Sequence, residues 1–322
     1  MKGAAPPAGR ARIGVDLGGT KIEAILLGAK GEVLTRRRVA SPRGEYEATL
    51  AAVGRLVNEL ETSLPGETTG DPARASVGVG IPGAISPATG LVKNANSTWL
   101  IGKPLDRDLE RLLARPVRVA NDANCFAVSE AVDGAGAGAH LVFGVILGTG
   151  VGGGIAIHGR PLLGANAIAG EWGHNPLPWP MAGELEGRPC YCGREGCIET
   201  FLSGPALEAE YRGKAGRPLA AAAIAQAAAG GEAIAQAVMA RYEERLARGL
   251  AHVVNLLDPE VIVLGGGLSN IGRLYETVPR LWGRFVFSDR VDTRLRPPVH
   301  GDSSGVRGAA WLWPPEPDEG AP

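Results

Sequence analysis

Pairs of apolar, β-rich runs separated by a glycine turn occur twice in the chain, once near the N-terminus and once near the middle. Arg12–Gly28 (RIGVDLGGTKIEAILLG) has two such runs on either side of a Gly-Gly-Thr turn, which predicts a β-hairpin. The next run, GEVLTRRRVA, alternates apolar with cationic residues, as an edge strand does. Strand, Gly-Thr turn and strand recur at His140–Gly159 (HLVFGVILGTGVGGGIAIHG). This repeat predicts two related α/β halves, each beginning with a hairpin whose turn exposes backbone N–H groups.

The remaining segments alternate between helical and strand patterns. Helical spacing predicts helices at Tyr46–Leu64, in PLDRDLERLLA, across Ser203–Leu257 and in the final GVRGAAWLW. Short apolar runs predict buried strands in ASVGVGIPG (Ala75–Gly83), VRVANDAN (Val117–Asn124) and VIVLGGGLSN, and the second of these strands is expected to break into a polar loop. LPGETTGDP is expected to be a loop, and the terminal PPEPDEGAP to fray.

Composition and charge argue against some binding partners, against secretion and against a membrane span. The 322 residues carry 33 Lys+Arg against 34 Asp+Glu, a net charge of −1, so no general basic field attracts nucleic acid or an anionic membrane. The N-terminal MKGAAPPAGRAR is not followed by the apolar run of a signal peptide. Residues 134–159 contain no Asp, Glu, Lys or Arg, but their centre is rich in glycine, which favours two buried strands over a membrane span. We expect a soluble, cytoplasmic protein.

Three of the four cysteines lie within CYCGREGC, residues 190–197. A redox pair, a disulfide and a metal site are the alternatives. Cys190 and Cys192 are too close in sequence for an easy mutual disulfide, and a CxxC motif is absent. Four cysteines in a chain of this size do not resemble a secreted disulfide framework. His174, 16 residues before Cys190, completes a Cys3His set. The sequence therefore predicts Zn²⁺ at His174, Cys190, Cys192 and Cys197, where it would anchor the irregular, Gly/Pro/Trp-rich stretch 164–197.

Three glycine-rich turns are candidates for nucleotide binding. DLGGTK (Asp16–Lys21) is either an ordinary hairpin turn or a phosphate cradle with a Thr hydroxyl and an acid that can face a metal through water; it lacks Walker A spacing. GTGVGG (Gly148–Gly153) matches G-x-G-x-x-G, but a strand follows it where dinucleotide binding needs a helix, so we reject NAD. A phosphate clamp built from both turns fits better. Gly265–Gly267 forms either a tight turn or a flat surface for adenine.

NDAN (Asn121–Asn124) follows a strand directly. Its polar residues either cap the helix CFAVSEAV as an Asx turn or supply a general base at a strand end that faces an interdomain cleft. We favour catalysis by Asp122. Cys125, just after it, is expected to be a small core residue.

Taken together, these motifs resemble the ROK family (repressors, open reading frames and sugar kinases). The resemblance rests on DLGGTK, GIPG, NDAN, GTGVGGG, GEWGH, CYCGREGCIE and LGGG in family order, from Ile13 to about Gly267, and HGDSSGVRGAAWLW extends it. It implies an α/β, actin/hexokinase-like (ribonuclease H-like) fold with two lobes and an interdomain cleft. The smaller lobe would contain residues 1–120 and 305–322 with the first phosphate hairpin. The larger lobe would contain residues 121–304 with the zinc site and the second phosphate loop.

Within the family, VKNANSTWL, EWGHNPLPW and HGDSSGVRGAAWLW most resemble bacterial fructokinases that also accept mannose. The resemblance implies ATP-dependent phosphorylation of a hexose at its 6-hydroxyl, with fructose as the expected substrate. Kinases for mannose, glucose or an N-acetylhexosamine, and a sugar-sensing regulator without turnover, are the alternatives. ROK repressors carry an N-terminal winged helix-turn-helix, whereas twelve residues precede Ile13 here, which disfavours DNA binding. Family precedent implies a homodimer.

The resemblance also implies residue roles. Asp122 is the catalytic base, and zinc is structural, with His174 as a ligand that also borders the sugar. The residues implied to contact sugar hydroxyls are Asn96, Asn121, Glu171, His174 and Glu199. The residues implied to handle ATP and Mg²⁺ are Asp16, Gly18, Gly19, Thr20, Lys21, Gly148, Thr149, Gly150, Gly265, Gly266 and Gly267.

Overall fold

The structure, a computed structural model, describes residues 11–64 and 74–314. The N-terminal residues 1–10, most of the expected loop LPGETTGDP and all but the first residue of the terminal PPEPDEGAP therefore lie outside the described residues. The chain forms two compact units. The first contains residues 1–133, 155–169 and 303–322, and the second contains residues 134–154 and 170–302. The lobe boundaries expected at 120/121 and 304/305 stay a prediction.

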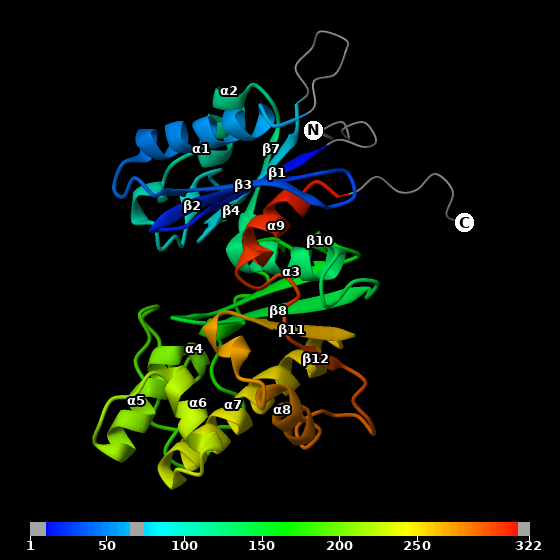
Figure 1. Cartoon of the computed structure of the whole chain (residues 1–322). Coiled ribbons are helices and arrows are strands. Elements are labelled where there is room, and N and C mark those ends of the chain that lie inside the picture. Colours follow the sequence, from blue (N-terminus) through cyan, green and yellow to red (C-terminus); the bar gives the residue numbers. More distant parts are fainter. Residues whose placement is uncertain (1–10, 65–73, 315–322) are drawn as a thin grey trace. The chain divides into compact units, whose positions relative to one another are not determined.

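The first unit is built on a five-stranded sheet in the order β3-β2-β1-β4-β7 (Figure 1). Strands β1 and β2 pair antiparallel through the Gly-Gly-Thr turn, and β3 pairs antiparallel with β2 as the edge strand, so both predictions are confirmed. Strands β1, β4 and β7 are parallel, which brings their carboxyl ends to one edge. The bounds are β1 Arg12–Leu17, β2 Lys21–Leu27, β3 Val33–Ala40, β4 Ser76–Ile81 and β7 Val117–Asn121, with the short β5 Ala84–Ile85, β6 Val92–Lys93 and η1 Thr98–Leu100 between β4 and β7.

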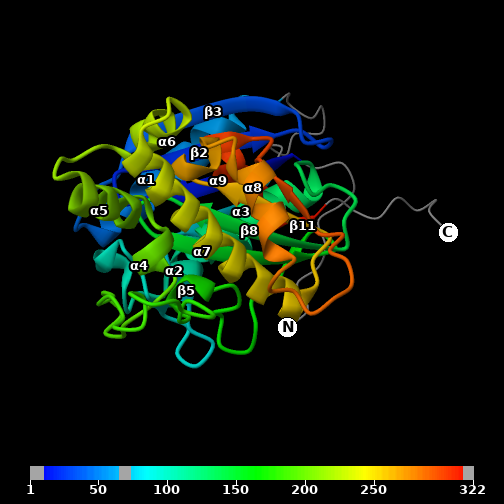
Figure 2. The same cartoon turned by 90° about the horizontal axis from the view of Figure 1, so that it is seen from below.

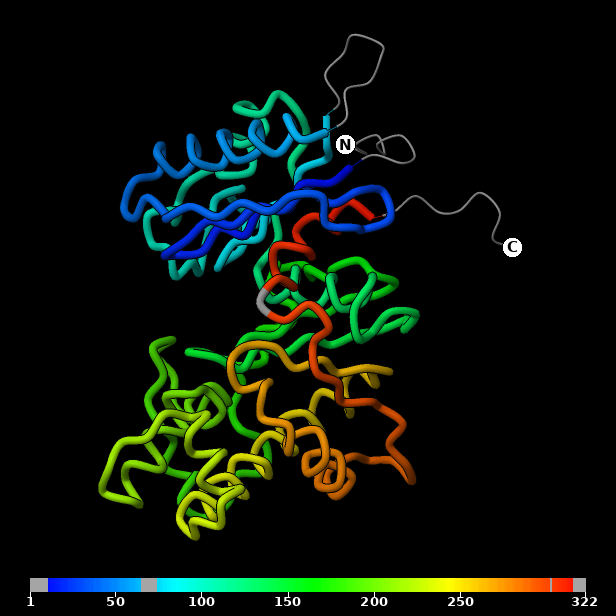
Figure 3. Tube along the Cα trace, viewed as in Figure 1, coloured from blue at the N-terminus to red at the C-terminus, as the bar shows by residue number. Residues whose placement is uncertain are grey.

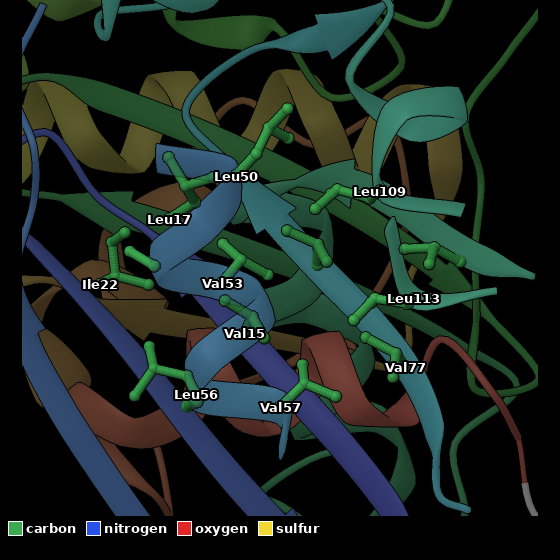
Figure 4. Packing of buried hydrophobic residues seen from close by; sticks show 14 of the residues in the cluster. Val15, Leu17, Ile22, Leu50, Val53, Leu56, Val57, Val77, Leu109 and Leu113 are labelled. Carbon is green, nitrogen blue, oxygen red and sulfur yellow. The ribbon is translucent and has the colours of Figure 1, made fainter. Parts of the chain in front are cut away.

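Helices cover both faces of this sheet. On one face, α1 (Tyr46–Glu61) and α2 (Leu105–Leu113) enclose an aliphatic core with β1, β2 and β4; Figure 4 shows Val15, Val53 and Leu109 among its members. On the other face lie α3 (Asp122–Val132) and α9 (Ser304–Trp311), so the C-terminal helix returns to the N-terminal strands (Figure 3).

Two glycines allow α9 to approach the strands closely. A Cβ on Gly14 would lie 2.0 Å from the carbonyl oxygen of Val306, and a Cβ on Gly78 would lie 1.9 Å from that of Ala309. Both distances are far below van der Waals contact, so only glycine fits at these positions of β1 and β4. Gly14 of β1 and Gly78 of β4 therefore serve close packing between the helix and the sheet.

The expected polar loop after β7 does not form. Strand β7 ends at Asn121 and α3 begins at Asp122. The Asn121 side chain accepts a hydrogen bond from the Ala123 N–H at 2.9 Å, which satisfies one of the free donors of the first helical turn. The cap therefore joins strand and helix without further residues.

The second unit carries the other Gly-Thr hairpin. Strands β8 and β9 are neighbours in a sheet with the order β10-β9-β8-β11-β12, and β11 is parallel to β8 and β12. Strand β9 leaves the second unit after Gly154, and β10 belongs to the first. The bounds are β8 Leu141–Leu147, β9 Val151–Ile157, β10 Arg160–Pro161, β11 Val261–Gly265 and β12 Arg294–Arg296. Residues 141–157 thus form strands, and no helix in the described part of the chain has the length and apolar composition that a membrane span requires.

Helices of the second unit gather around the long α7. The helical region predicted at Ser203–Leu257 resolves into three helices, and α7 crosses in front of β8 and β11 in Figure 2. Trp172 packs between sheet and helix, with its ring 5.9 Å from that of Phe143, and a Cβ on Gly249 of α7 would lie 2.9 Å from the indole. The bounds are η2 Trp172–His174, α4 Glu199–Leu202, α5 Gly204–Ala215, α6 Ala221–Ala229, α7 Ala233–Leu257, η3 Gly267–Asn270, α8 Leu274–Trp282 and η4 Gly301–Ser303.

A buried ionic network attaches the irregular stretch to α7. Glu184 accepts hydrogen bonds from Arg245 at 2.6 Å and from Arg248 at 2.8 Å, and Arg248 also donates to the carbonyl of Trp179 at 2.6 Å. Arg248 is fully buried. Burial pushes the pKa of Glu184 upward, but the Met181 N–H and the two guanidinium groups outweigh it and hold that pKa below its ordinary value. The network therefore stabilises the loop that precedes the cysteines.

Replacing Arg248 with methionine is expected to lower the free energy of unfolding by about 3–5 kcal/mol, because Glu184 would be left as a buried charge with half of its cationic partners. Urea denaturation monitored by far-UV circular dichroism measures this. The matched control is Arg290→Met, because Arg290 pairs with Asp292 in a highly exposed salt bridge and its loss should cost about 0–1 kcal/mol. Equal losses in both variants would contradict the role given to the buried network.

Candidate active site

In the first unit, two acidic side chains lie at the edge where the parallel strands end. Asp16 of β1 is in register with Gly80 of β4, and Gly80 with Ala120 of β7. Asp122 follows two residues after Ala120. The parallel arrangement therefore brings together two carboxylates that are more than a hundred residues apart in sequence.

Asp122 is the first residue of α3 and partly buried. One of its carboxylate oxygens accepts the Ala123 N–H at 2.8 Å. The positive end of the helix dipole favours an ionised carboxylate at this position. A partly buried carboxylate at a strand end can orient a hydroxyl group and accept its proton.

Cys125 experiences the charges of both acids, Asp16 and Asp122. Its thiol is fully buried in a small cluster with Ala120, Ala309 and Leu312, which confirms it as a core residue. Burial raises the pKa of Cys125 well above its ordinary value, and the charges of Asp16 and Asp122 raise it further. Burial, followed by the charge of Glu23, raises the pKa of Asp16 to about 6. At neutral pH Asp16 is therefore still mostly ionised and able to face a cation.

The first Gly-Thr turn follows Asp16 directly. The Gly18 N–H donates to the Lys21 carbonyl at 3.0 Å, and Thr20 is exposed at the tip of the turn. Arg43 donates to the carbonyl of Gly19 at 2.9 Å and so places a positive charge beside the turn. Arg43 was not found by sequence reasoning, because a single arginine in a loop has no distinguishing pattern.

Asn96 is exposed, and its backbone N–H donates to the carbonyl of Pro82, the residue after β4, at 3.1 Å. This contact places Asn96 at the same edge of the sheet. In the first unit, the structure thus brings together the edge residues Asp16, Asn96, Asn121 and Asp122.

In the second unit, the other Gly-Thr turn and the glycine triplet are neighbours. They follow β8 and β11, which are parallel and adjacent, with Gly265 in register with Ile146. Gly266 has a φ of +78°, and a Cβ there would lie 2.4 Å from the Leu147 carbonyl oxygen, so only glycine fits. A Cβ on Gly148 or Gly267 would meet nothing within 4 Å, which leaves open space at both backbones. The arrangement leaves a strip of bare backbone on which phosphates and a flat base can lie.

The predicted Cys3His set converges in the second unit. The ligand atoms of His174, Cys190, Cys192 and Cys197 all lie within 4.8 Å of one another. His174 Nδ1 lies 3.6 Å from Cys190 Sγ, and the Sγ atoms of Cys192 and Cys197 are 3.6 Å apart. Four tetrahedral ligands at zinc–sulfur distances of about 2.3 Å would be separated by about 3.8 Å, so the donor set fits Zn²⁺. All four cysteines of the chain are free thiols, which rejects the disulfide alternative.

The backbone of residues 190–197, which hold the three clustered cysteines, forms a compact knuckle. The Cys190 N–H donates to the Arg194 carbonyl at 2.8 Å, and the Gly193 N–H donates to the Cys190 carbonyl at 3.0 Å. Gly193 and Gly196 have φ values of +85° and +71°, which side chains with a Cβ rarely adopt. The CYCGREGC spacing therefore reflects a turn that returns the third thiol to the first two.

Tyr191, inside the knuckle, is a residue that sequence reasoning missed. Its hydroxyl is 3.1 Å from His174 Nε2, and the two rings meet edge to face at 5.2 Å. Burial and the charge of Glu199, followed by the charges of Cys190 and Glu171, raise the pKa of Tyr191 to about 12. The hydroxyl therefore stays protonated and fixes the ring orientation of His174, with Nδ1 toward the thiols. The position of Tyr191 between the first two cysteines was the signal in the sequence that could have identified it.

Tyr191 and Glu199 line the same pocket, and the charges of Glu199 and Glu171 both raise the pKa of Tyr191. Glu171 is exposed and precedes η2, whereas Glu199 begins α4, where one of its carboxylate oxygens accepts the Val151 N–H at 2.9 Å. A pocket of about 480 Å³ is lined by Thr149, Cys190, Tyr191, Glu199 and Ser203, among others. In the second unit, the structure thus brings together the second turn, the knuckle and two of the predicted sugar-binding residues, His174 and Glu199.

Comparison with known proteins agrees with this architecture. The ROK family model matches residues 12–316. The N-acetyl-D-glucosamine kinase of Pectobacterium atrosepticum is 40% identical over 304 residues, covering 93% of this chain and 97% of that protein. A ROK hexokinase from Thermus thermophilus has a TM-score of 0.80 at 30% identity and covers 94% of this chain and 97% of its own. A ROK glucokinase from Streptomyces griseus, solved with glucose and AMPPNP, has a TM-score of 0.74 at 28% identity, covering 94% and 98%.

The solved hexokinase and glucokinase confirm the α/β, hexokinase-like fold. The narrower likeness to fructokinases is corrected, because the similar relatives include N-acetyl-D-glucosamine kinases at 40% identity. With matched motifs in order, a matched fold and a family model that spans nearly the whole described chain, this protein belongs to the ROK family of sugar kinases and their relatives.

Proposed function

We propose that this protein is an ATP-dependent kinase that phosphorylates N-acetyl-D-glucosamine at its 6-hydroxyl. The observation that carries the proposal is the 40% identity over 304 residues to an N-acetyl-D-glucosamine kinase. The carboxylates, glycine turns and cysteine knuckle described above supply the groups that such a reaction requires. Fructose, the substrate expected from the sequence, becomes the alternative substrate that the assay below must exclude.

Asp122 would act as the catalytic base. Phosphoryl transfer passes through a loose transition state, so positioning and charge neutralisation contribute more than strong base catalysis. The carboxylate, held at the start of α3 by the Ala123 N–H, would orient the sugar hydroxyl and accept its proton late in the reaction.

The glycine turns would bind the nucleotide. Backbone N–H groups of Gly19 and Thr20 in the first turn and of Thr149 and Gly150 in the second suit phosphate oxygens. The Gly265–Gly267 triplet, with open space beside the backbone of Gly267, suits adenine. Asp16, mostly ionised at neutral pH, would face Mg²⁺ through water. Bound Mg²⁺ supplies charge neutralisation on the phosphates.

Polar side chains would recognise the sugar hydroxyls. Carboxylates suit this task because each accepts hydrogen bonds from two neighbouring hydroxyls, and an analogue that lacks one leaves a buried acceptor unpaired. The proposed set is Asn96, Asn121, Glu171, His174 and Glu199. Because His174 Nδ1 faces the thiols, its contact with sugar would use Nε2, which now pairs with the Tyr191 hydroxyl. Tyr191 therefore joins the proposed sugar-binding residues.

Zinc would be held by His174, Cys190, Cys192 and Cys197 and would act as a cross-link only. Its effect would be to fix His174 and the knuckle relative to α4, which begins at Glu199. The residues of the knuckle would take no part in proton or phosphoryl transfer.

A coupled assay of ADP release across a panel of sugars tests the proposal. With ATP and Mg²⁺, we expect kcat/KM for N-acetylglucosamine to exceed that for glucose, fructose, mannose and N-acetylmannosamine by at least about tenfold, a difference of about 1.4 kcal/mol in transition-state binding. Fructose as the best substrate would overturn the N-acetylglucosamine assignment. Sugar binding by calorimetry without any ADP release would overturn kinase activity in favour of a sugar-sensing protein.

A further inference from the structure

Glu199 is hydrogen-bonded to the second Gly-Thr turn. Its Oε2 accepts the Val151 N–H at 2.9 Å, at the point where the turn becomes β9. The same oxygen lies 2.6 Å from the position that a Cβ on Gly150 would occupy. The carboxylate therefore packs directly against the turn, and Gly150 is the residue type that leaves room for it.

A second contact from the same segment holds the other end of the turn. The Gly204 N–H donates to the Gly148 carbonyl at 2.8 Å. Across the turn itself, the Gly148 N–H donates to the Gly150 carbonyl at 3.0 Å. Residues 199–204 thus contact the turn at Gly148, its first residue, and at Val151, the residue directly after the turn. These two contacts define the shape of the turn from outside.

The segment 199–204 is in turn fixed to the knuckle. Cys197 lies two residues before Glu199, and the Thr200 hydroxyl donates to its carbonyl at 2.7 Å. The Cys190 Sγ lies 4.0 Å from Glu199 Oε1. The carboxylate therefore has one oxygen on the phosphate turn and the other beside the cysteines and the proposed sugar-binding side chains.

We propose that Glu199 is a positioning residue for the nucleotide: by accepting the Val151 N–H it holds the Gly148–Gly150 turn in its phosphate-binding shape, besides contacting the sugar. This rests on the proposed kinase function. The role depends on a hydrogen-bond acceptor at this position and not on the negative charge, because a charge beside a phosphate site repels the nucleotide. Glutamine should therefore replace glutamate in this role, whereas alanine should not.

The test is the Kd of AMPPNP with Mg²⁺, measured by isothermal titration calorimetry in the absence of sugar. We expect Glu199→Ala to raise this Kd about 5–10-fold and Glu199→Gln to stay within about twofold of the wild-type protein. The control is Glu186→Ala, which removes an exposed acid from the stretch before the cysteines, outside the proposed binding residues, and should leave the Kd unchanged. A role confined to sugar recognition would not move this readout at all.

A second variant keeps the test independent of the stability of Glu199→Ala. A methyl group in Gly150→Ala would displace the Glu199 carboxylate, so this variant should also raise the Kd, and its effect should not add to that of Glu199→Ala. Equal Kd values in all variants, or equal weakening by Glu199→Ala and Glu199→Gln, would overturn the positioning role alone. No binding of AMPPNP by the wild-type protein would overturn the proposed function itself.

Discussion

Replacing Asp122 with alanine is expected to abolish phosphoryl transfer and to leave sugar affinity within about tenfold of the wild-type protein. The proposed role of Asp122 is to orient the reacting hydroxyl and accept its proton, and a positioned general base contributes about 10²–10⁴-fold to the rate. We therefore expect kcat to fall by about 10³-fold or more. Coupled ADP release measures kcat, and calorimetry with the sugar alone measures the affinity.

Asp122→Asn is the matched variant for this prediction. Its amide oxygen can still accept the Ala123 N–H, so the start of α3 should remain intact while the base is lost. We expect a melting temperature close to that of the wild-type protein and a kcat as low as that of Asp122→Ala. A turnover rate near the wild-type value in either variant would remove Asp122 from its proposed role.

Removing the metal from the knuckle is expected to cause the second large effect. A ligand at about 1,000 times its Kd stabilises the folded state by about 4 kcal/mol, and zinc binds Cys3His sets far more tightly than most ligands. A loss of this size lowers Tm by roughly 8–16 °C in a unit of 150–250 residues. Differential scanning calorimetry before and after exhaustive chelation measures the shift, and plasma mass spectrometry measures the zinc content.

Two cysteine variants provide the controls, one at a proposed zinc ligand and one outside the four-ligand cluster. Cys192→Ser should lose both the zinc and the same increment of Tm, because Cys192 is a member of the four-ligand cluster. Cys125→Ala should keep the zinc, since Cys125 is buried in the first unit and lies outside that cluster. An unchanged Tm after complete metal removal, or a protein that never carried zinc, would contradict the structural cross-link.

Local chemistry explains why much of the fold could be predicted from the sequence. The two Gly-Thr turns and the edge strand with alternating arginines are encoded within runs of at most twenty residues, and each forms as predicted. The spacing of His174, Cys190, Cys192 and Cys197 likewise predicted a convergence that the structure contains. Patterns of this kind need no knowledge of distant parts of the chain.

Contacts between distant segments could not be predicted in the same way. Gly14 and Gly78 are glycines because α9 packs on them, yet α9 begins at Ser304. The contacts of Arg43 with Gly19 and of Glu199 with Val151 likewise join residues whose sequence separation gives no pattern. At the end of β7, the expected polar loop was wrong because one side chain, Asn121, caps the next helix at once.

Substrate choice was the other limit of the sequence. Residue types such as Asn96 and Glu199 indicate hydrogen bonding to hydroxyls, but they do not distinguish a ketohexose from an acetamido sugar. The distinction depends on the placement of the same groups to within a fraction of an ångström. The proposed substrate rests instead on the 40% overall identity to an N-acetyl-D-glucosamine kinase.

The most direct measurement of the central claim is a crystal structure of the protein with N-acetylglucosamine and AMPPNP bound. We expect the 6-hydroxyl of the sugar to lie about 2.6–3.2 Å from the Asp122 carboxylate. A hexose bound with its 6-hydroxyl directed away from Asp122, or bound in another part of the molecule, would contradict the account.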